Sequence, residues 1–294
     1  KIISPKALNK IYINNNINLE NDIVPPRMVY KVSKNPKLIA ITNTGKIGII
    51  QWEFCGKNPG QINKFLPSGL EGEEILVILP VPIEQNYSLG LLTSDGRFKR
   101  LAMKEVLEMS NRATTILKLK KDVSLKSALF CHNKGEIIIT TNIGRIVKIK
   151  INDEDIPLMG KLAQGPNIIK LFPEEKIISA ISSHDSLVED IILITEKGSC
   201  TKLRTNQIRL CKKGDFGEIG ISINDLKNKP INRVIYANKA NYQTIVITDA
   251  EKYQQVSLEV IKSQDYKKEH KNILHLQNDE KIKKIETIID GLDN

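Results

Sequence analysis

Short apolar runs recur along this chain, and each is followed by a polar turn and a second apolar run. In four copies the turn ends on a glycine, which follows turn-forming residues such as Asn43 and Thr44. An apolar, β-branched run, a short glycine-containing turn and a second apolar run are typical of a β-hairpin. The turn glycines of the four predicted hairpins are Gly45, Gly96, Gly144 and Gly198. We expect each of them to adopt the left-handed backbone conformation that closes a short loop.

The predicted hairpins form a series, because their turn glycines are 51, 48 and 54 residues apart. A fifth, weaker copy spans Thr244 to Lys252 and has Glu251 in place of the glycine, so its turn is expected to differ or to be looser. A strand with an acidic or polar start precedes each hairpin, and another short strand follows it. The repeat units are 28–72, 73–121, 122–172, 173–228 and 229–278, with 279–294 and 1–27 as candidates to close the ring.

A unit of about four strands, repeated at this period, predicts blades around an axis. The expected fold is therefore all-β, a propeller-like disc of five to six four-stranded blades forming a single domain over residues 1–294. A long β-solenoid and two separate β-sandwiches are the alternatives. Solenoid coils are usually shorter than these units, and sandwiches do not repeat internally. Helical patterns are weak and are confined to short segments at Met103 to Met109 and Gln254 to Asp265.

Composition narrows the setting of the protein. The sequence has no apolar run of about 18 residues, so no membrane span is expected. It begins at Lys1 without a visible signal peptide and is expected to be a piece of a longer protein. The four cysteines lack metal-ligand spacing, and Cys131 and Cys200 fall in or beside strand patterns as small core residues. A reduced, cytoplasmic setting fits this cysteine usage.

The net charge of +10 is unevenly distributed along the chain. Residues 89–150 carry 13 basic and five acidic side chains, whereas residues 151–294 carry 21 basic and 22 acidic ones. A basic sector on a disc suits a polyanion, although a lysine-rich surface without a ligand would have the same composition.

The spacing of the basic residues favours a polyanion. They recur one residue after the turn glycine (Lys46, Arg97, Arg145) and four residues after it (Arg100, Lys148, Lys202). Equivalent positions on successive blades would trace an arc, which suits a bent DNA backbone. Apolar residues occupy the second and fifth positions after the glycine, and these lie on opposite faces of an ideal strand. Either both faces are buried or a bulge changes the phase.

No base-reading element is apparent in the sequence. There is no recognition-helix pattern, zinc finger or aromatic platform, so the surface would contact DNA phosphates with little dependence on the DNA sequence. An enzymatic interpretation has little support, because no nucleophile–base pair, phosphate loop or metal cluster stands out.

Several segments, in order, resemble the C-terminal domain of the A subunit of bacterial type IIA DNA topoisomerases, namely DNA gyrase and topoisomerase IV. The segments that carry the resemblance are LLTSDGRFKRL (Leu91 to Leu101), RATTILKLK (Arg112 to Lys120), IITTNIGRIVKI (Ile138 to Ile149) and PLMGKLAQGPNIIKL (Pro157 to Leu171). The likeness recurs across roughly residues 28–290. It implies a β-pinwheel whose blades exchange strands with their neighbours. It also implies a basic outer rim that bends DNA and presents a segment to the catalytic core during ATP-dependent strand passage.

The resemblance further implies which activities and partners belong to the parent protein. The catalytic tyrosine lies in an upstream domain that this chain lacks, so the chain alone is expected to have no enzymatic activity and no cofactor. The parent enzyme would be an ATP-dependent type II topoisomerase that uses ATP and Mg²⁺. Implied partners are double-stranded DNA, the A-subunit core and the ATPase B subunit in a heterotetramer, in the cytoplasm at the nucleoid and without a membrane. The alternative is a propeller that serves as a protein-interaction scaffold, with its charge serving solubility.

One departure from the family concerns the first blade. Gyrase A-subunit domains usually carry a Gln-Arg-Arg-Gly-Gly-Lys/Arg-Gly box there, and the region from Trp52 to Glu71 keeps some of its glycines and lysines but not its sequence. This favours a topoisomerase IV-like or a divergent gyrase A-like protein that bends DNA without wrapping a full turn. The candidate DNA-binding residues are Lys46, Lys57, Lys64, Arg97, Lys99, Arg100, Arg112, Lys118, Arg145, Lys148, Lys150 and Lys202.

Overall fold

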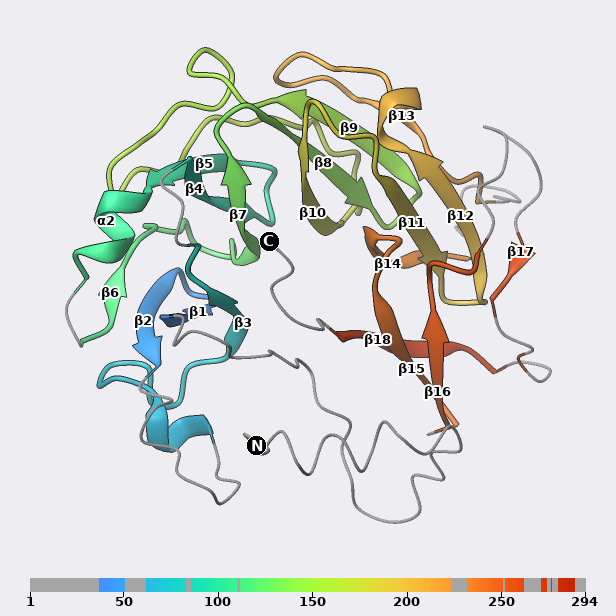
Figure 1. The fold of residues 1–294 in the computed structure, drawn as a ribbon, viewed down its shortest axis with the longest axis horizontal. Coiled ribbons are helices and arrows are strands. Elements are labelled where there is room, and N and C mark those ends of the chain that lie inside the picture. The colour runs from blue at the N-terminus through green and yellow to red at the C-terminus, as the bar shows by residue number, and fades with distance from the viewer. Residues whose placement is uncertain are drawn as a thin grey trace.

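A computed structural model describes residues 37–50, 62–82, 86–109, 112–223, 232–250, 252–261, 271–273, 276 and 280–288. Within these residues the strands form five antiparallel sheets, three of four strands and two of three strands. The sheets are arranged around a central axis, as Figure 1 shows. This arrangement confirms the predicted all-β, propeller-like fold and is neither a solenoid nor a pair of sandwiches.

Each sheet contains one predicted hairpin. The hairpins are β1 (Leu38–Thr42) with β2 (Lys46–Ile50), β4 (Tyr87–Thr93) with β5 (Phe98–Ala102), β8 (Gly135–Thr141) with β9 (Arg145–Lys150), β11 (Asp190–Thr195) with β12 (Ser199–Arg204), and β15 (Gln243–Thr248) with β16 (Tyr253–Ser257). The turn glycines Gly45, Gly96, Gly144 and Gly198 have φ of 83°, 85°, 81° and 82°, which confirms the left-handed conformation. Glu251 lies outside the described residues, so its looser turn stays a prediction.

The remaining strands of each sheet come from the next repeat unit. The first strand of each hairpin pairs with the opening strand of the following unit: β3 (Ile75–Pro80), β7 (Leu125–His132), β10 (Ile177–His184), β14 (Val234–Lys239) and β18 (Ile282–Ile288). The second strand pairs with a two-residue strand from the end of that following unit: β6 (Thr114–Thr115), β13 (Glu218–Ile219) and β17 (Lys271–Asn272). In the second sheet, an isolated bridge between Arg97 and Asn167 takes this place. Neighbouring units therefore exchange strands, and a sheet does not coincide with one contiguous repeat unit.

The exchanged strands define the inside and the outside of the disc. In Figure 1, β3, β7, β10, β14 and β18 surround the centre, and they contact one another in sequence order. Strands β6, β13 and β17 lie at the outer rim. The rim is therefore built from the short closing segments of the repeat units.

Apolar side chains fill the spaces between successive sheets, so both faces of each hairpin are covered. On β9, Ile146 belongs to the cluster shared with the fourth sheet, whereas Ile149 belongs to the cluster shared with the second sheet. Phe98 and Leu101 of β5 likewise contribute to two different clusters. The β8–β9 pairing runs without a register shift, so no bulge is needed to explain the apolar second and fifth positions. Of the two alternatives, burial of both faces is correct.

Shorter elements connect the strands. They are η2 (Ile62–Phe65), α2 (Met103–Leu107) and η3 (Thr205–Gln207). Helix α2 confirms the helix predicted at Met103 to Met109. The helix predicted at Gln254 to Asp265 is wrong over the residues that β16 occupies, because cross-strand pairing with β15 overrides their weak helical pattern.

Cys131 and Cys200 are buried as predicted, and burial raises the pKa of the Cys131 thiol to about 12. In the described part of the chain no helix is long and apolar enough to cross a membrane. The same residues contain no group of three or more His, Cys, Asp or Glu side chains that could hold a metal ion.

Candidate nucleic-acid interface

The basic residues four positions after the turn glycine lie between sheets and not on the rim. Arg100, Lys148 and Lys202 are only 3%, 6% and 7% exposed. Each donates a hydrogen bond to a backbone carbonyl in the segment that follows the next hairpin: Arg100 Nε to Ile156 O (2.6 Å), Lys148 Nζ to Thr205 O (3.0 Å) and Lys202 Nζ to Glu259 O (3.1 Å). We call these three side chains the anchor residues.

The direction of the anchor residues follows from strand geometry. Positions two and four after the glycine share one strand face, and position two packs against the next sheet. Each anchor residue also lies beside a carboxylate: Asp153 at 2.7 Å, Glu136 at 3.4 Å and Asp190 at 3.7 Å, respectively. In the first hairpin the equivalent position is Ile49, which packs against an apolar cluster. The position is therefore an interior one even where the residue is not basic.

The basic residues one position after the turn glycine also have internal partners. Lys46 Nζ lies 2.6 Å from Glu73, at the start of the next unit's first strand. In the fifth hairpin, where Glu251 replaces the glycine, Lys252 Nζ likewise lies 3.3 Å from Glu280. Hydrogen bonds from the Lys46 ammonium and from a threonine hydroxyl lower the pKa of Glu73. Arg97 differs, since its guanidinium lies 3.3 Å from Asp95 and donates to Gly165 O at 3.1 Å. The side chains of Lys46 and Arg97 are 37% and 30% exposed, so both remain accessible in part.

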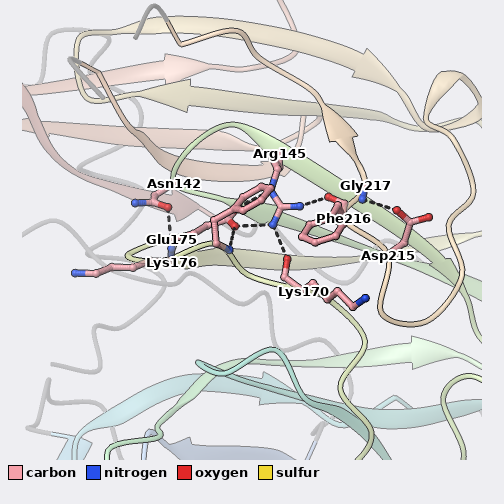
Figure 2. A network of polar contacts seen from close by, with 9 residues as sticks. Asn142, Arg145, Lys170, Glu175, Lys176, Asp215, Phe216 and Gly217 are labelled. Atoms are coloured by element: carbon pink, nitrogen blue, oxygen red, sulfur yellow. Dashed lines mark hydrogen bonds and ion pairs between the residues drawn. The ribbon is translucent and has the colours of Figure 1, made fainter. Parts of the chain in front are cut away.

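Arg145 forms the most extensive of these networks, as Figure 2 shows. Its Nε and Nη2 donate to the two carboxylate oxygens of Glu175 at 2.7 and 2.5 Å, and Nη2 also donates to Lys170 O at 2.7 Å. The Nη1 atom donates to Phe216 O. Both members of the Arg145–Glu175 pair are buried. A bidentate guanidinium–carboxylate pair of this kind fixes the relative positions of the segments that carry it.

Lys99 is fully buried on the same strand as Arg100. Its Nζ donates to Gly160 O at 2.8 Å and to Lys161 O at 2.7 Å. Burial lowers the pKa of this ammonium to about 8, although the carboxylate of Glu105 opposes the shift.

Five of the predicted DNA-binding residues are buried, so the basic positions after the turn glycines do not all form an accessible arc. A phosphate contact needs an accessible donor, and the interior members have theirs directed at protein oxygens. The residues concerned are Lys99, Arg100, Arg145, Lys148 and Lys202. The structure assigns these five a role in joining neighbouring units.

The other predicted residues keep an accessible position. Lys64, Arg112, Lys118 and Lys150 are exposed, and Lys57 lies outside the described residues. Their contact with DNA stays a prediction.

Among the described residues, the largest run of exposed basic side chains lies on residues 112–126, which we call the basic segment. It includes the rim strand β6 and leads to the inner strand β7. Its exposed basic residues are Arg112, Lys118, Lys120, Lys121 and Lys126, and its exposed acidic residue is Asp122. Among the described residues, the four lysines have no ion-pair partner. Lys120, Lys121 and Lys126 were missed as site residues, although the run Lys-Leu-Lys-Lys at 118–121 is visible in the sequence.

Comparisons with known proteins point to the same family as the segments singled out in the sequence. The family described as DNA gyrase C-terminal domain, beta-propeller, matches residues 91–132, 135–184 and 189–229. The A subunit of DNA gyrase from Ureaplasma parvum serovar 3 is 27% identical over 222 residues, which are 75% of this chain and 26% of that protein. The A subunit of DNA topoisomerase 4 from Synechocystis sp. is 27% identical over 160 residues, covering 51% of this chain and 17% of that protein. The chain thus spans about a quarter or less of the length of these relatives.

A solved structure supports the fold. The crystal structure of the C-terminal domain of DNA topoisomerase IV superposes with a TM-score of 0.70, 18% identity, and coverage of 86% of this chain and 79% of that one. At this identity the likeness shows the fold alone. The matched repeats, the similar proteins and the strand-exchanged sheets together confirm the resemblance seen in the sequence: the chain is similar to the C-terminal domains of the A subunits of DNA gyrase and topoisomerase IV.

Proposed function

We propose that this chain binds double-stranded DNA without strong sequence preference, chiefly through the basic segment. The supporting observation is that five exposed basic residues and one exposed acidic residue lie on residues 112–126, which run from the rim strand β6 to the start of the inner strand β7. Lysines that are not neutralised by protein carboxylates are available to replace the counterions of DNA phosphates. Because the buried basic residues already bind protein oxygens, the candidate DNA-binding surface is smaller than the sequence suggests.

In this proposal the domain serves the A subunit of a type IIA topoisomerase in the bacterial cytoplasm. It bends a DNA segment and presents it to the catalytic core, which works with the ATPase B subunit, ATP and Mg²⁺. The chain itself contributes binding and shape, and the chemistry belongs to the core. A basic segment confined to one sector favours bending over a full wrap, because wrapping needs continuous contacts that offset the elastic cost of the bend.

Duplex binding across a salt series tests the proposal. The 294-residue chain is mixed with two unrelated duplexes, without ATP or divalent metal, from low salt to about 0.15 M. We expect similar affinities for both duplexes and a steep loss of affinity as salt increases. An absence of binding at low salt would reject the proposal and favour the protein-interaction scaffold instead. A single strongly preferred sequence would also contradict it.

A further inference from the structure

Two aromatic rings are stacked and half-exposed where the third sheet meets the rim. Phe172 and Phe216 have ring centroids 5.1 Å apart and an interplanar angle of 19°. They are 47% and 45% exposed. Phe216 precedes the rim strand β13 by two residues, and Phe172 lies between the closing segment of its own unit and β10. Two exposed phenylalanines stacked on each other form an apolar ridge instead of scattered surface residues.

The ridge is held from beneath by the buried Arg145. The Arg145 guanidinium carbon lies 4.6 Å from the Phe172 ring centroid and 5.7 Å from that of Phe216. The guanidinium is itself held in place, because it also binds Glu175, Lys170 O and Phe216 O (Figure 2). The backbone of Phe172 is fixed as well, since its N–H donates to Glu175 at 2.8 Å. The rings are therefore preorganised, which lowers the entropic cost of inserting them into a partner.

Positive charge lies on the Phe216 side of the ridge. The Lys170 ammonium lies 5.5 Å from the Phe216 ring centroid, and Lys170, Lys212 and Lys213 are exposed. The neighbouring carboxylate of Asp215 is paired with Arg209 at 3.1 Å, and the exposed acid Glu174 lies on the Phe172 side. An apolar ridge with lysines on one side suits a duplex, whose phosphates border a groove that exposes base edges.

We propose that Phe172 and Phe216 form an aromatic wedge that presses into the minor groove and partly unstacks a base step. Apolar side chains inserted in this way kink DNA toward the major groove. The wedge would concentrate the bend at one point of the rim, and it would favour flexible pyrimidine–purine steps such as TA. The inference rests on the proposed function, since a wedge can act only on DNA that the domain binds.

Fluorescence of 2-aminopurine tests the wedge separately from binding. The base is placed beside a central TA step of a short duplex, where unstacking increases its emission. Affinity is measured on the same samples by anisotropy. We expect the wild-type chain to bind and to raise the emission at saturation. The Phe172→Ala/Phe216→Ala variant should still bind with an unchanged salt slope but should lose the rise in emission.

Two further variants keep the result interpretable. Leu187→Ala/Val188→Ala removes two exposed apolar residues from the β10–β11 loop and should keep the full emission rise. The Phe172→Ala variant alone should lose part of the increase in emission, and it replaces the double variant in the test if the double variant does not fold. Wild-type binding without a rise in emission overturns the wedge while leaving the proposed function intact, and so does a rise that the double variant retains. No wild-type binding at low salt overturns both.

Discussion

At the scale of single residues, charge repeated along the chain is not the same as charge on the surface. Arg145 and Glu175 show this, because each neutralises the other in the interior. The free-energy cost of removing one partner of such a pair is large, since the other charge is left buried and unpaired. The same change at an exposed lysine costs little.

This contrast gives a stability prediction. Arg145→Ala should lower the free energy of unfolding by about 3–5 kcal/mol, whereas Lys150→Ala, five positions further along β9, should change it by less than about 0.5 kcal/mol. Urea denaturation of the two variants measures the difference. Equal, small losses for both variants would mean that the Arg145 network is not maintained in solution.

Lys99 gives a pH-dependent prediction at the same scale. Its folded pKa of about 8 lies below the ordinary lysine value of 10.5, so between these limits the unfolded chain binds more protons at this position. The free energy of unfolding of the wild type should therefore rise with pH in this window, relative to Lys99→Met, and the advantage should be lost as pH falls through 8. Denaturation of both proteins from about pH 7 to about pH 10.5 tests this, because the other titrating groups, such as Cys131, are present in both proteins and their contributions cancel. Parallel pH profiles would contradict the burial of a charged Lys99.

At the scale of elements, each of the four glycine-containing hairpin turns receives the closing segment of the next repeat unit. Ile116, Ile168, Gly220 and Ile273 donate backbone hydrogen bonds to the carbonyls of Gly45, Gly96, Gly144 and Gly198, each at 2.9 Å. The approach is close: a Cβ on Gly144 would lie 2.3 Å from Ile221 O. Glycine is thus required twice, for the positive φ and for the docking of the closing segment.

Substitutions at two glycines can distinguish the cost of the positive φ from the cost of displacing the closing segment. Gly72 has φ of 77° and no atom within 4 Å of the position that a Cβ would occupy, so Gly72→Ala should cost about 1 kcal/mol for the backbone conformation alone. Gly144→Ala should cost about 1–3 kcal/mol more, because the closing segment must shift. Thermal denaturation of both variants is the measurement. Similar losses would show that the closing segment does not dock against the turn.

The same elements show which features of the fold and the site can be predicted from the sequence. The hairpins and their left-handed glycines are predictable, because a turn is encoded by a few adjacent residues such as Asn43 to Gly45. The exchange of strands between units was predicted from the family resemblance alone, because no local sequence pattern encodes it. Burial of Arg100, Lys148 and Lys202 was not predictable, since each carbonyl partner lies 56 or 57 residues away. The Phe172–Phe216 stack depends on two loops 44 residues apart and leaves no spacing signal.

At the scale of the whole molecule, the basic residues fall into two groups with different tasks. The interior group joins each unit to the next, through Arg145 and the anchor residues. The exposed group, of which the basic segment is the largest run among the described residues, is the one that we propose contacts DNA. This division is the central claim, and it predicts that the salt dependence of DNA binding follows the exposed group.

The most direct test is the slope of log affinity against log salt for a short duplex. Replacing Lys118, Lys120 and Lys121 together by glutamine should reduce that slope by up to about 2.7, at about 0.9 for each phosphate contact. The matched control replaces Lys281, Lys283 and Lys284, three exposed lysines at and beside the inner strand β18, and should leave the slope unchanged. A slope that is unaltered in the first variant, or reduced equally in the control, would contradict a DNA path along the basic segment.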